Sequence, residues 1–349
     1  MRSFFEKTST AKKVLVLDLG FLGDTVHLIP ALWMIKQSYK NAVVDVAVSS
    51  NVVSLLVCFP WINKTWGYTR YPKHATFTES LGFLRALRKE KYDVVINLNG
   101  SDRSGWLGLL SGVPKRLGRL TSRGRRKVSK LFFTDCVEYP YFLEPTFMQR
   151  CRCLEKAGFS YDTPEFHCEV KPETLEGVDI TSDDKNQYFH ISPFTTADRK
   201  ELPMEILIEL INGLNRKWPS KKIVLSCAPV AREINKMNEL INRLSFIPWR
   251  VYSGNLALPQ LVAIIASSCL HFSGDTGPIH IAVMTETPSI SWFQPSPFKD
   301  WVPYGENHKV IFGLDGYQES NIYGVFAGAI IDEAQVLIKK TKVFELIAD

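Results

Sequence analysis

The chain has 349 residues, of which 45% are hydrophobic and 22% are charged, and its formal net charge is +6. This composition is that of a globular protein long enough for two ordinary domains, which excludes a disordered or low-complexity chain. The positive charge is too small for a typical nucleic-acid-binding protein, and it suits an anionic ligand, an anionic membrane surface, or neither in particular.

The cysteines and the apolar runs indicate the compartment. Seven cysteines, an odd number, are scattered over the chain, which does not indicate a disulfide framework and favours a reducing cytosol. Apolar runs never reach the roughly 18 uncharged residues of a transmembrane helix, and the first residues lack a signal-peptide pattern. We therefore expect a cytoplasmic protein whose membrane role, if it has one, is peripheral on the inner face of the cytoplasmic membrane.

Strands and helices are predicted to alternate in the first hundred residues. In chain order they are a strand at 13–19, a helix at 25–38, a strand at 43–48, a helix at 52–58, an extended piece at 64–68, a basic amphipathic helix at 81–89 and a strand at 92–98. Pro30 is expected in the first two turns of its helix, where proline is tolerated best. This alternation is the signature of a parallel sheet with helices on both faces.

The alternation is predicted to break at a basic run. Residues 115–130 contain eight Lys or Arg among sixteen residues, and 138–145 is rich in Pro and Tyr. Such a run is usually a solvated surface, and the alternative is contact with an anionic acceptor or a phospholipid surface. A helix at 146–157 follows, and the polar, turn-rich stretch 158–184 indicates a domain boundary near residue 170.

The second half is predicted to resume the same alternation. Its elements are strands at 188–192, 222–226, 270–273 and 288–293, helices at 204–217, 231–244, 258–267 and 279–285, a short extended piece at 251–252 and a terminal helix at 331–346. The chain is thus predicted to form two α/β domains, 1–170 and 171–349, with the terminal helix a candidate to pack back on the first. Because ligands bind beyond the carboxyl ends of parallel strands, we expect the site in a cleft between the domains.

Two strand-to-helix turns are the candidates for chemistry. Gly23 and Asp24 end the first turn, and Asp275, Thr276 and Gly277 form another late in the chain. A helix N-terminus offers unpaired N–H groups and a positive dipole end, which suits a phosphate. Asp24 is either a cap of the following helix or a general base that takes a proton from a hydroxyl nucleophile.

Other residues near the second turn have competing interpretations. Thr195, Thr196 and Lys200 either surround a phosphate or form a capped loop with a solvated lysine. His280 alone is read as a half-buried histidine. No zinc spacing and no G-x-G-x-x-G fingerprint occurs, so we expect neither a metal nor a dinucleotide cofactor. With no Asp-x-Asp either, Lys200, Thr276 and helix amides are expected to neutralise a phosphate.

Four segments together resemble glycosyltransferase family 9, the bacterial heptosyltransferases of lipopolysaccharide core assembly. They are 15–32, 92–101, 111–116 and 273–282, in matching order over nearly the whole chain. The last, Ser-Gly-Asp-Thr-Gly-Pro-Ile-His-Ile-Ala, is the most specific. The resemblance implies a GT-B fold, in which two Rossmann-like domains face each other across a central cleft.

The resemblance also implies an activity and site residues. It implies inverting, metal-independent transfer of heptose from ADP-heptose to a lipid-linked inner-core acceptor, with Asp24 as catalytic base. The implied donor contacts are Thr195, Thr196, Lys200, Asp275, Thr276, Gly277 and His280, and Glu233 is a candidate for an acid that reaches the donor's ribose. We assign acceptor binding to Gly23, Lys115, Arg116, Arg119 and Arg123. The alternatives are transfer of another nucleotide sugar, glycosylation of a protein, or a non-catalytic nucleotide-binding member.

Overall fold

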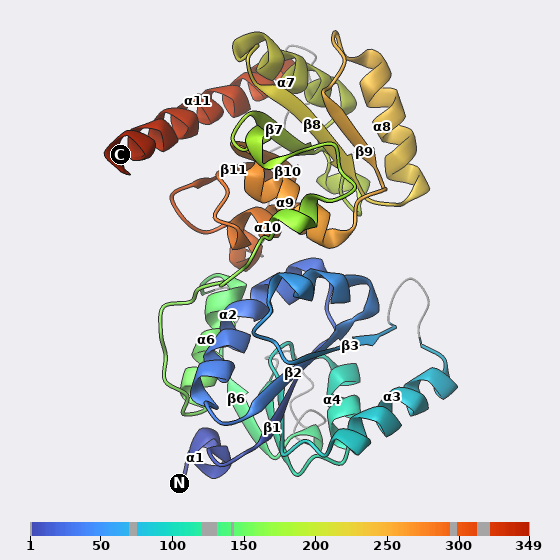
Figure 1. The fold of residues 1–349 in the computed structure, drawn as a ribbon, viewed down its shortest axis with the longest axis vertical. Coiled ribbons are helices and arrows are strands. Elements are labelled where there is room, and N and C mark those ends of the chain that lie inside the picture. Colours follow the sequence, from blue (N-terminus) through green and yellow to red (C-terminus); the bar gives the residue numbers. More distant parts are fainter. Residues whose placement is uncertain are drawn as a thin grey trace. The chain divides into compact units, whose positions relative to one another are not determined.

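The computed structural model describes residues 2–69, 75–120, 131–140, 143–293, 299–312 and 322–348 (Figure 1). The chain divides into two compact units. Unit 1 comprises Met1–Glu169 with Lys299–Trp301, and unit 2 comprises Val170–Phe298 with Val302–Asp349. No helix in the described part of the chain is long and apolar enough to cross a membrane.

Unit 1 is built on a six-stranded parallel sheet of order β3-β2-β1-β4-β5-β6. Its strands are β1 (Lys13–Asp18), β2 (Val43–Ser49), β3 (Lys64–Tyr68), β4 (Val94–Asn97), β5 (Lys115–Leu120) and β6 (Asp135–Glu138). Its described helices are α1 (Phe4–Thr8), α2 (Leu22–Ser38), the 3-10 helix η1 (Ser50–Cys58), α3 (Phe77–Glu90), α4 (Asp102–Leu110) and α6 (Thr146–Lys156). Successive strands are added on one side of β1 up to β3 and on the other side from β4, so the strand order reverses between β1 and β4. In sheets of this order ligands bind at that reversal point.

The basic run does not end the sheet, and the predicted break of the alternation at residue 115 is wrong. Residues 115–120 form β5 between β4 and β6. Leu117 and Leu120 are buried, and Arg119 is buried too because its guanidinium donates to Gln149 Oε1 at 2.7 Å. The positive charge of residues 115–130 favoured a surface segment, whereas residues 115–120 form a strand in which Arg119 is buried against Gln149. Helix α4 and strand β6 were also not predicted.

Helix α2 begins three residues before the predicted start. The carboxylate Oδ2 of Asp24 accepts the backbone N–H of Phe21 at 2.9 Å, so Asp24 lies inside the first helical turn. Pro30 is consequently in the helix interior and not in its first two turns.

Unit 2 repeats the topology of unit 1 with a sheet of order β12-β11-β10-β7-β8-β9, all parallel. Its strands are β7 (Tyr188–Ser192), β8 (Lys222–Cys227), β9 (Arg250–Ser253), β10 (Leu270–Gly274), β11 (Ser289–Phe293) and β12 (His308–Phe312), the last of which was not predicted. Its helices include α7 (Met204–Lys217), α8 (Ala231–Arg243), α9 (Leu258–Ser267), α10 (Gly277–Met284) and α11 (Ile322–Ala348), and 3-10 helices include η4 (Asp198–Lys200). The reversal point of this sheet lies between β7 and β10. The two Rossmann-like parallel sheets confirm the predicted α/β class.

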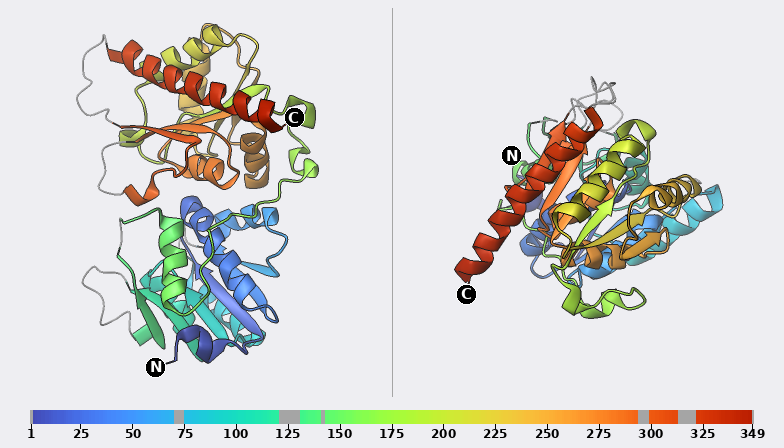
Figure 2. Two further views of the ribbon diagram at one scale, coloured as in Figure 1. Left: turned by 90° about the vertical axis from the view of Figure 1, so that its left-hand side faces the viewer. Right: turned by 90° about the horizontal axis from the view of Figure 1, so that it is seen from above.

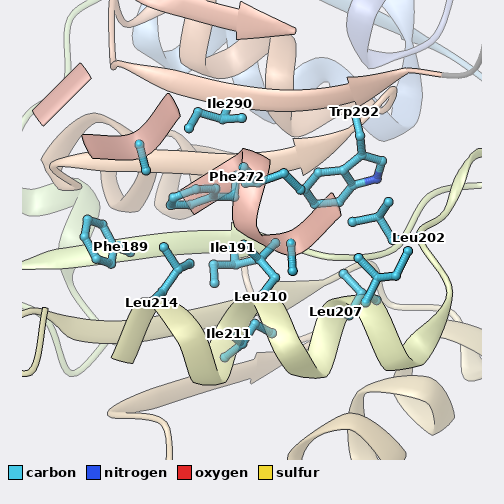
Figure 3. Packing of buried hydrophobic residues seen from close by; sticks show 14 of the residues in the cluster. Phe189, Ile191, Leu202, Leu207, Leu210, Ile211, Leu214, Phe272, Ile290 and Trp292 are labelled. Atoms are coloured by element: carbon cyan, nitrogen blue, oxygen red, sulfur yellow. The ribbon is translucent and has the colours of Figure 1, made fainter. Parts of the chain in front are cut away.

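The core of unit 2 lies between the sheet and α7. Figure 3 shows Leu207, Leu210 and Leu214 of α7 facing Phe189 of β7 and Phe272 of β10. Apolar residues three or four apart form one helix face, which explains why this helix was predicted with the bounds that the structure shows. Burying one such side chain stabilises the fold by about 1.5–3 kcal/mol.

The terminal helix α11 belongs to the same core. Phe326, Ile330 and Leu337 are buried in the cluster around α7, and α11 lies alongside α7 (Figure 2). The side chains described on α11 thus pack within unit 2, and packing of the helix against the amino-terminal domain stays a prediction.

A short segment that is distant in sequence completes unit 1. The carbonyl oxygen of Asp300 accepts from Thr146 Oγ1 at 3.0 Å, and its carboxylate accepts from Gln149 Nε2 at 3.3 Å. The ring of Trp301 contacts that of His27 edge-on, with centroids 5.0 Å apart. Residues 299–301 are thus fixed to helices α2 and α6.

A buried pair of histidines lies on the sheet of unit 2. His190 of β7 and His271 of β10 are fully buried, and their Nδ1 atoms are 2.9 Å apart. His190 Nε2 is 2.9 Å from Ser226 Oγ. One Nδ1 must donate and the other accept, so at least the accepting ring is neutral. Burial lowers the pKa of His190 to about 3 and holds the pKa of His271 well below its usual range.

This pair predicts an acid-sensitive unit 2. Below about pH 6.5 the unfolded histidines bind protons and the folded ones do not, so the free energy of unfolding falls as the pH falls, by about 1.4 kcal/mol per pH unit for each histidine. Hydrogen exchange of the β7 and β10 amides between pH 7 and pH 5 measures this slope. We expect a shallower slope in His190→Gln and an unchanged one in His167→Gln, a histidine of unit 1. Equal slopes in all three proteins would contradict the assignment.

Candidate active site

Asp24 lies at the reversal point of the unit 1 sheet, in the turn between β1 and α2. Its side chain is 25% exposed, the most accessible acid of the turn. The turn places the carboxylate by two contacts, the N–H of Phe21 on Oδ2 and the guanidinium of Arg150 3.4 Å from Oδ1. Both interpretations of Asp24 therefore remain compatible, because one oxygen caps the helix while the carboxylate stays partly open to solvent.

A buried ion pair between Asp18 and Arg150 stabilises this turn. Asp18, at the end of β1, is fully buried, and its Oδ2 is 2.8 Å from NH1 of Arg150, which is 2% exposed. Asp18 Oδ1 accepts the N–H of Gly20 at 2.9 Å and the side-chain N–H of Asn99 at 2.7 Å. Arg150 NH1 also donates to the backbone oxygen of Asp24 at 2.6 Å. Three segments far apart in the chain thus converge on one turn.

Gly20 allows this turn to close tightly. A Cβ at position 20 would lie 2.2 Å from Cβ of Asp24 and 2.4 Å from its Cγ. Carbon atoms that are not bonded to each other do not approach so closely, so the contact of Gly20 with Asp24 requires a residue without a side chain at position 20.

The second candidate turn lies at the reversal point of the unit 2 sheet. Lys200 Nζ, at the end of η4 after β7, forms an ion pair with Asp275 Oδ2 after β10 at 2.6 Å. Gly274 lets Thr195 and Trp292 pack closely at this turn, since a Cβ there would meet Thr195 Cγ2 at 2.9 Å and Trp292 Nε1 at 2.8 Å. A half-exposed cation is therefore fixed beside the N-terminus of α10.

The other predicted residues of this turn differ in accessibility. Thr276 is the N-cap of α10, and Gly277 is its first residue. Thr196 is exposed, whereas Thr195 is buried, with its hydroxyl donating to the Ala197 carbonyl at 2.9 Å. His280 is 4% exposed. The structure thus brings Thr195, Lys200 and Asp275 together with the amides that begin α10, and Thr196 is an exposed residue of the preceding loop.

Comparison with known proteins assigns the chain to a family. The profile of glycosyltransferase family 9 (heptosyltransferase) matches residues 81–322, more than half of the chain. The chain belongs to glycosyltransferase family 9. It is therefore a glycosyltransferase of the heptosyltransferase type, and the resemblance seen in its motifs is confirmed.

Individual relatives agree over most of their length. The chain is 24% identical to lipopolysaccharide heptosyltransferase 3 of Escherichia coli (strain K12) over 86% of this chain and 88% of the relative. A glycosyl transferase family 9 structure from Veillonella parvula superposes with a TM-score of 0.79 at 18% identity, covering 94% of this chain and 97% of that one. E. coli heptosyltransferase WaaC with ADP-2-deoxy-2-fluoro heptose gives 0.74 at 20% identity, covering 92% and 99%. These likenesses confirm the GT-B fold.

A charged cluster beside the second candidate turn was not predicted. Arg232 of α8 contacts the Thr195 carbonyl and lies 2.9 Å from Glu201 Oε1, while Lys236 Nζ lies 2.7 Å from Glu201 Oε2. Glu201 Oε1 accepts the N–H of Thr195 at 2.9 Å. The cluster holds the loop that follows β7. No local pattern marks it, because its members come from separate elements.

Glu233, the candidate ribose-binding acid of this family-9 chain, is 4% exposed. Its Oε2 accepts the N–H of Ala228 at 3.0 Å, which closes the turn between β8 and α8. Burial raises the pKa of Glu233. The carboxylate thus has a structural contact within unit 2.

The predicted acceptor residues are placed in three different ways. Lys115 is exposed at the start of β5, and Gly23 is half-buried in the first turn of α2. Arg116 donates to the backbone carbonyls of Phe132 at 2.8 Å and Val113 at 2.6 Å, and Arg119 is buried against Gln149. The guanidinium groups of Arg116 and Arg119 therefore hold unit 1 together. Arg123 lies outside the described residues.

The contact at Gly20 predicts a loss of stability on substitution. In Gly20→Ala the new methyl group must displace Asp24 or β1, which costs about 1–3 kcal/mol for an overpacked site. Gly82→Ala, in α3 with open space around a new Cβ, should instead stabilise by about 0.5–1 kcal/mol. Chemical unfolding of both variants checks the opposite signs, and an unaffected Gly20→Ala would contradict the close approach.

Proposed function

We propose that the protein transfers heptose from ADP-heptose to the inner core of lipopolysaccharide. Three observations support the donor. The relative from E. coli is a lipopolysaccharide heptosyltransferase, a solved relative carries an ADP-heptose analogue, and unit 2 presents a cation at a helix N-terminus. Helix amides and a lysine are the groups that bind a diphosphate in proteins.

The single observation that carries the mechanism is the placement of Asp24. A partly exposed carboxylate at a sheet reversal point, held by a backbone N–H and a guanidinium, has the geometry of a fixed proton acceptor. In the proposed reaction Asp24 removes the proton of the acceptor hydroxyl. The hydroxyl oxygen attacks the anomeric carbon, the bond to the diphosphate breaks, and ADP leaves from the opposite face. One in-line displacement inverts the anomeric configuration.

The leaving group is proposed to be stabilised by protein groups without a metal ion. Lys200 supplies a positive charge, and the N–H groups at the start of α10 point along the positive end of the helix dipole. Thr196 adds an exposed hydroxyl, and Gly277 lets the backbone approach the phosphate closely. Asp275 keeps Lys200 in place before the donor binds.

The acceptor is proposed to be an anionic, lipid-linked sugar. Unit 1 offers Asp24 and Gly23 at the turn and Lys115 at the start of β5 as contacts, the last by charge alone. An enzyme with such an acceptor acts in the cytoplasm, at the inner face of the membrane where the lipid is embedded. Mass spectrometry of core oligosaccharide from cells lacking the protein tests this assignment, since a missing heptose identifies both donor and acceptor class. An unchanged core, with a missing sugar elsewhere, would instead support another nucleotide sugar or a protein acceptor.

Asp24→Asn should abolish most of the transfer. Because the amide cannot accept the hydroxyl proton, kcat is expected to fall by about 10²- to 10⁴-fold, with little change in ADP binding. The matched control is Asp102→Asn, an acid in the first turn of α4 in the same unit, which should keep the parent rate. A parental rate in Asp24→Asn would remove Asp24 as the base and favour another mechanism or a non-catalytic member.

Lys200→Met should weaken nucleotide binding. Loss of the charged contact, with Asp275 left unpaired beside the phosphates, is expected to raise the Kd for ADP by roughly 10- to 100-fold. Isothermal titration of both proteins with ADP measures it. Lys217→Met, which removes an ion pair with Asp332 on α11, is the control and should bind as the parent does. Equal affinities in Lys200→Met and the parent would place the diphosphate elsewhere.

A further inference from the structure

Two carboxylates in unit 1 share a single guanidinium. Arg150 lies between Asp18, at 2.8 Å from its Oδ2, and Asp24, at 3.4 Å from its Oδ1. Asp18 and Arg150 are almost completely buried, whereas Asp24 is the partly exposed member. Two carboxylates with one cation leave one net negative charge, and the exposed position of Asp24 is where that charge can act.

The contacts of Asp18 are those of a carboxylate. Oδ1 accepts hydrogen bonds from Gly20 and Asn99, and Oδ2 lies 2.8 Å from the cationic guanidinium of Arg150. A protonated acid would need an acceptor for its own hydrogen. Burial raises the pKa of Asp18, and Arg150 opposes this shift. A buried charge of this kind persists because the opposite charge is in direct contact with it.

Arg150 fixes Asp24 at two points. Its NH1 donates to the Asp24 backbone oxygen at 2.6 Å, and its NH2 lies 3.4 Å from the carboxylate. The shorter contact holds the backbone of the first turn of α2, and the longer one orients the side chain. Because NH1 also lies 2.8 Å from Asp18, the carboxylate of Asp18 compensates a large part of the positive charge that Asp24 would otherwise experience.

We propose that Arg150 is a positioning residue for Asp24, and that Asp18 is the counter-charge that lets Arg150 orient this base without weakening it. The inference rests on the proposed function, since it assumes that Asp24 accepts the acceptor's proton. An arginine paired with Asp24 alone would orient the carboxylate but stabilise its ionised form and so reduce its affinity for a proton. The negative charge of Asp18 offsets the effect of Arg150 on the proton affinity of Asp24, while the contacts of Arg150 still orient the Asp24 carboxylate.

The other titratable groups around Asp24 are few among the described residues. His27 lies one turn further along α2 and packs against Trp301 and Phe147. Cys151 follows Arg150 on α6, and burial raises its pKa to about 12, so that the thiol stays neutral. Asp300 is bound by Gln149 on α6. The charges that face Asp24 directly are those of Asp18 and Arg150.

The pH profile of kcat/KM tests this arrangement, because its acidic limb reports the base of the free enzyme. In Asp18→Asn the arginine loses its counter-charge, so the limb should move to lower pH by about one unit. In Arg150→Met the cation is lost, so the limb should move to higher pH by about one unit. Arg150→Lys should restore the limb partly toward the parent's. The control Arg152→Met, on the exposed face of α6, should leave the profile unchanged.

The double variant Asp18→Asn/Arg150→Gln covers the case in which a single variant does not fold, since it leaves no unpaired buried charge. It should lower kcat by at least tenfold with an unchanged donor KM, because Asp24 loses its orientation. Acidic limbs that stay in place or move in the same direction in the folded single variants would overturn the proposal, and so would a parental kcat in the double variant. Failure of the underlying assumption that Asp24 is the base is distinct, because Asp24→Asn would then keep the parental rate.

Discussion

The ion pair between Asp18 and Arg150 is the constraint on which unit 1 depends. It joins the end of β1 to α6 in a place that water does not reach, and charges in such surroundings are tolerated only in direct contact with each other. The same guanidinium holds the backbone of α2 at Asp24. The sheet, the helix that follows its first strand and the last helix of the unit are therefore fixed relative to one another around one turn, and the partly open carboxylate has little freedom to turn away.

The two units share one topology but present side chains of opposite charge at the equivalent turn. In each sheet the strand order reverses beside the first strand, and a candidate turn lies at each reversal point. In unit 1 the turn presents an acid supported by a buried arginine, and in unit 2 it presents a lysine supported by an acid. In both, a glycine permits the close approach, Gly20 against Asp24 and Gly274 against Thr195. The same local architecture thus presents a carboxylate in one unit and an ammonium group in the other.

The sequence predicted correctly those elements that a periodic pattern of neighbouring residues defines. Helix α7 has an apolar face that repeats every three to four residues, and its predicted and observed bounds coincide. Strand β5 was missed because the charges of Lys115, Arg116 and Arg119 concealed its buried leucines, and the partner that allows Arg119 to be buried lies thirty residues away. Asp18, a charge within an apolar run, was a visible signal of a buried partner. Nothing near Arg150 in the sequence marks it as that partner, because their contact exists only in the folded sheet.

The segment 299–301 has a consequence for how the halves of the chain depend on each other. Unit 1 is not a continuous stretch of sequence, since Asp300 and Trp301 complete it from beyond β11. An isolated fragment ending near residue 169 would carry every strand of its sheet yet leave Gln149 without its carboxylate partner and the ring of His27 without its contact with Trp301. The amino-terminal half is therefore finished only after most of the carboxy-terminal half has been synthesised, so its final packing on the ribosome must come late.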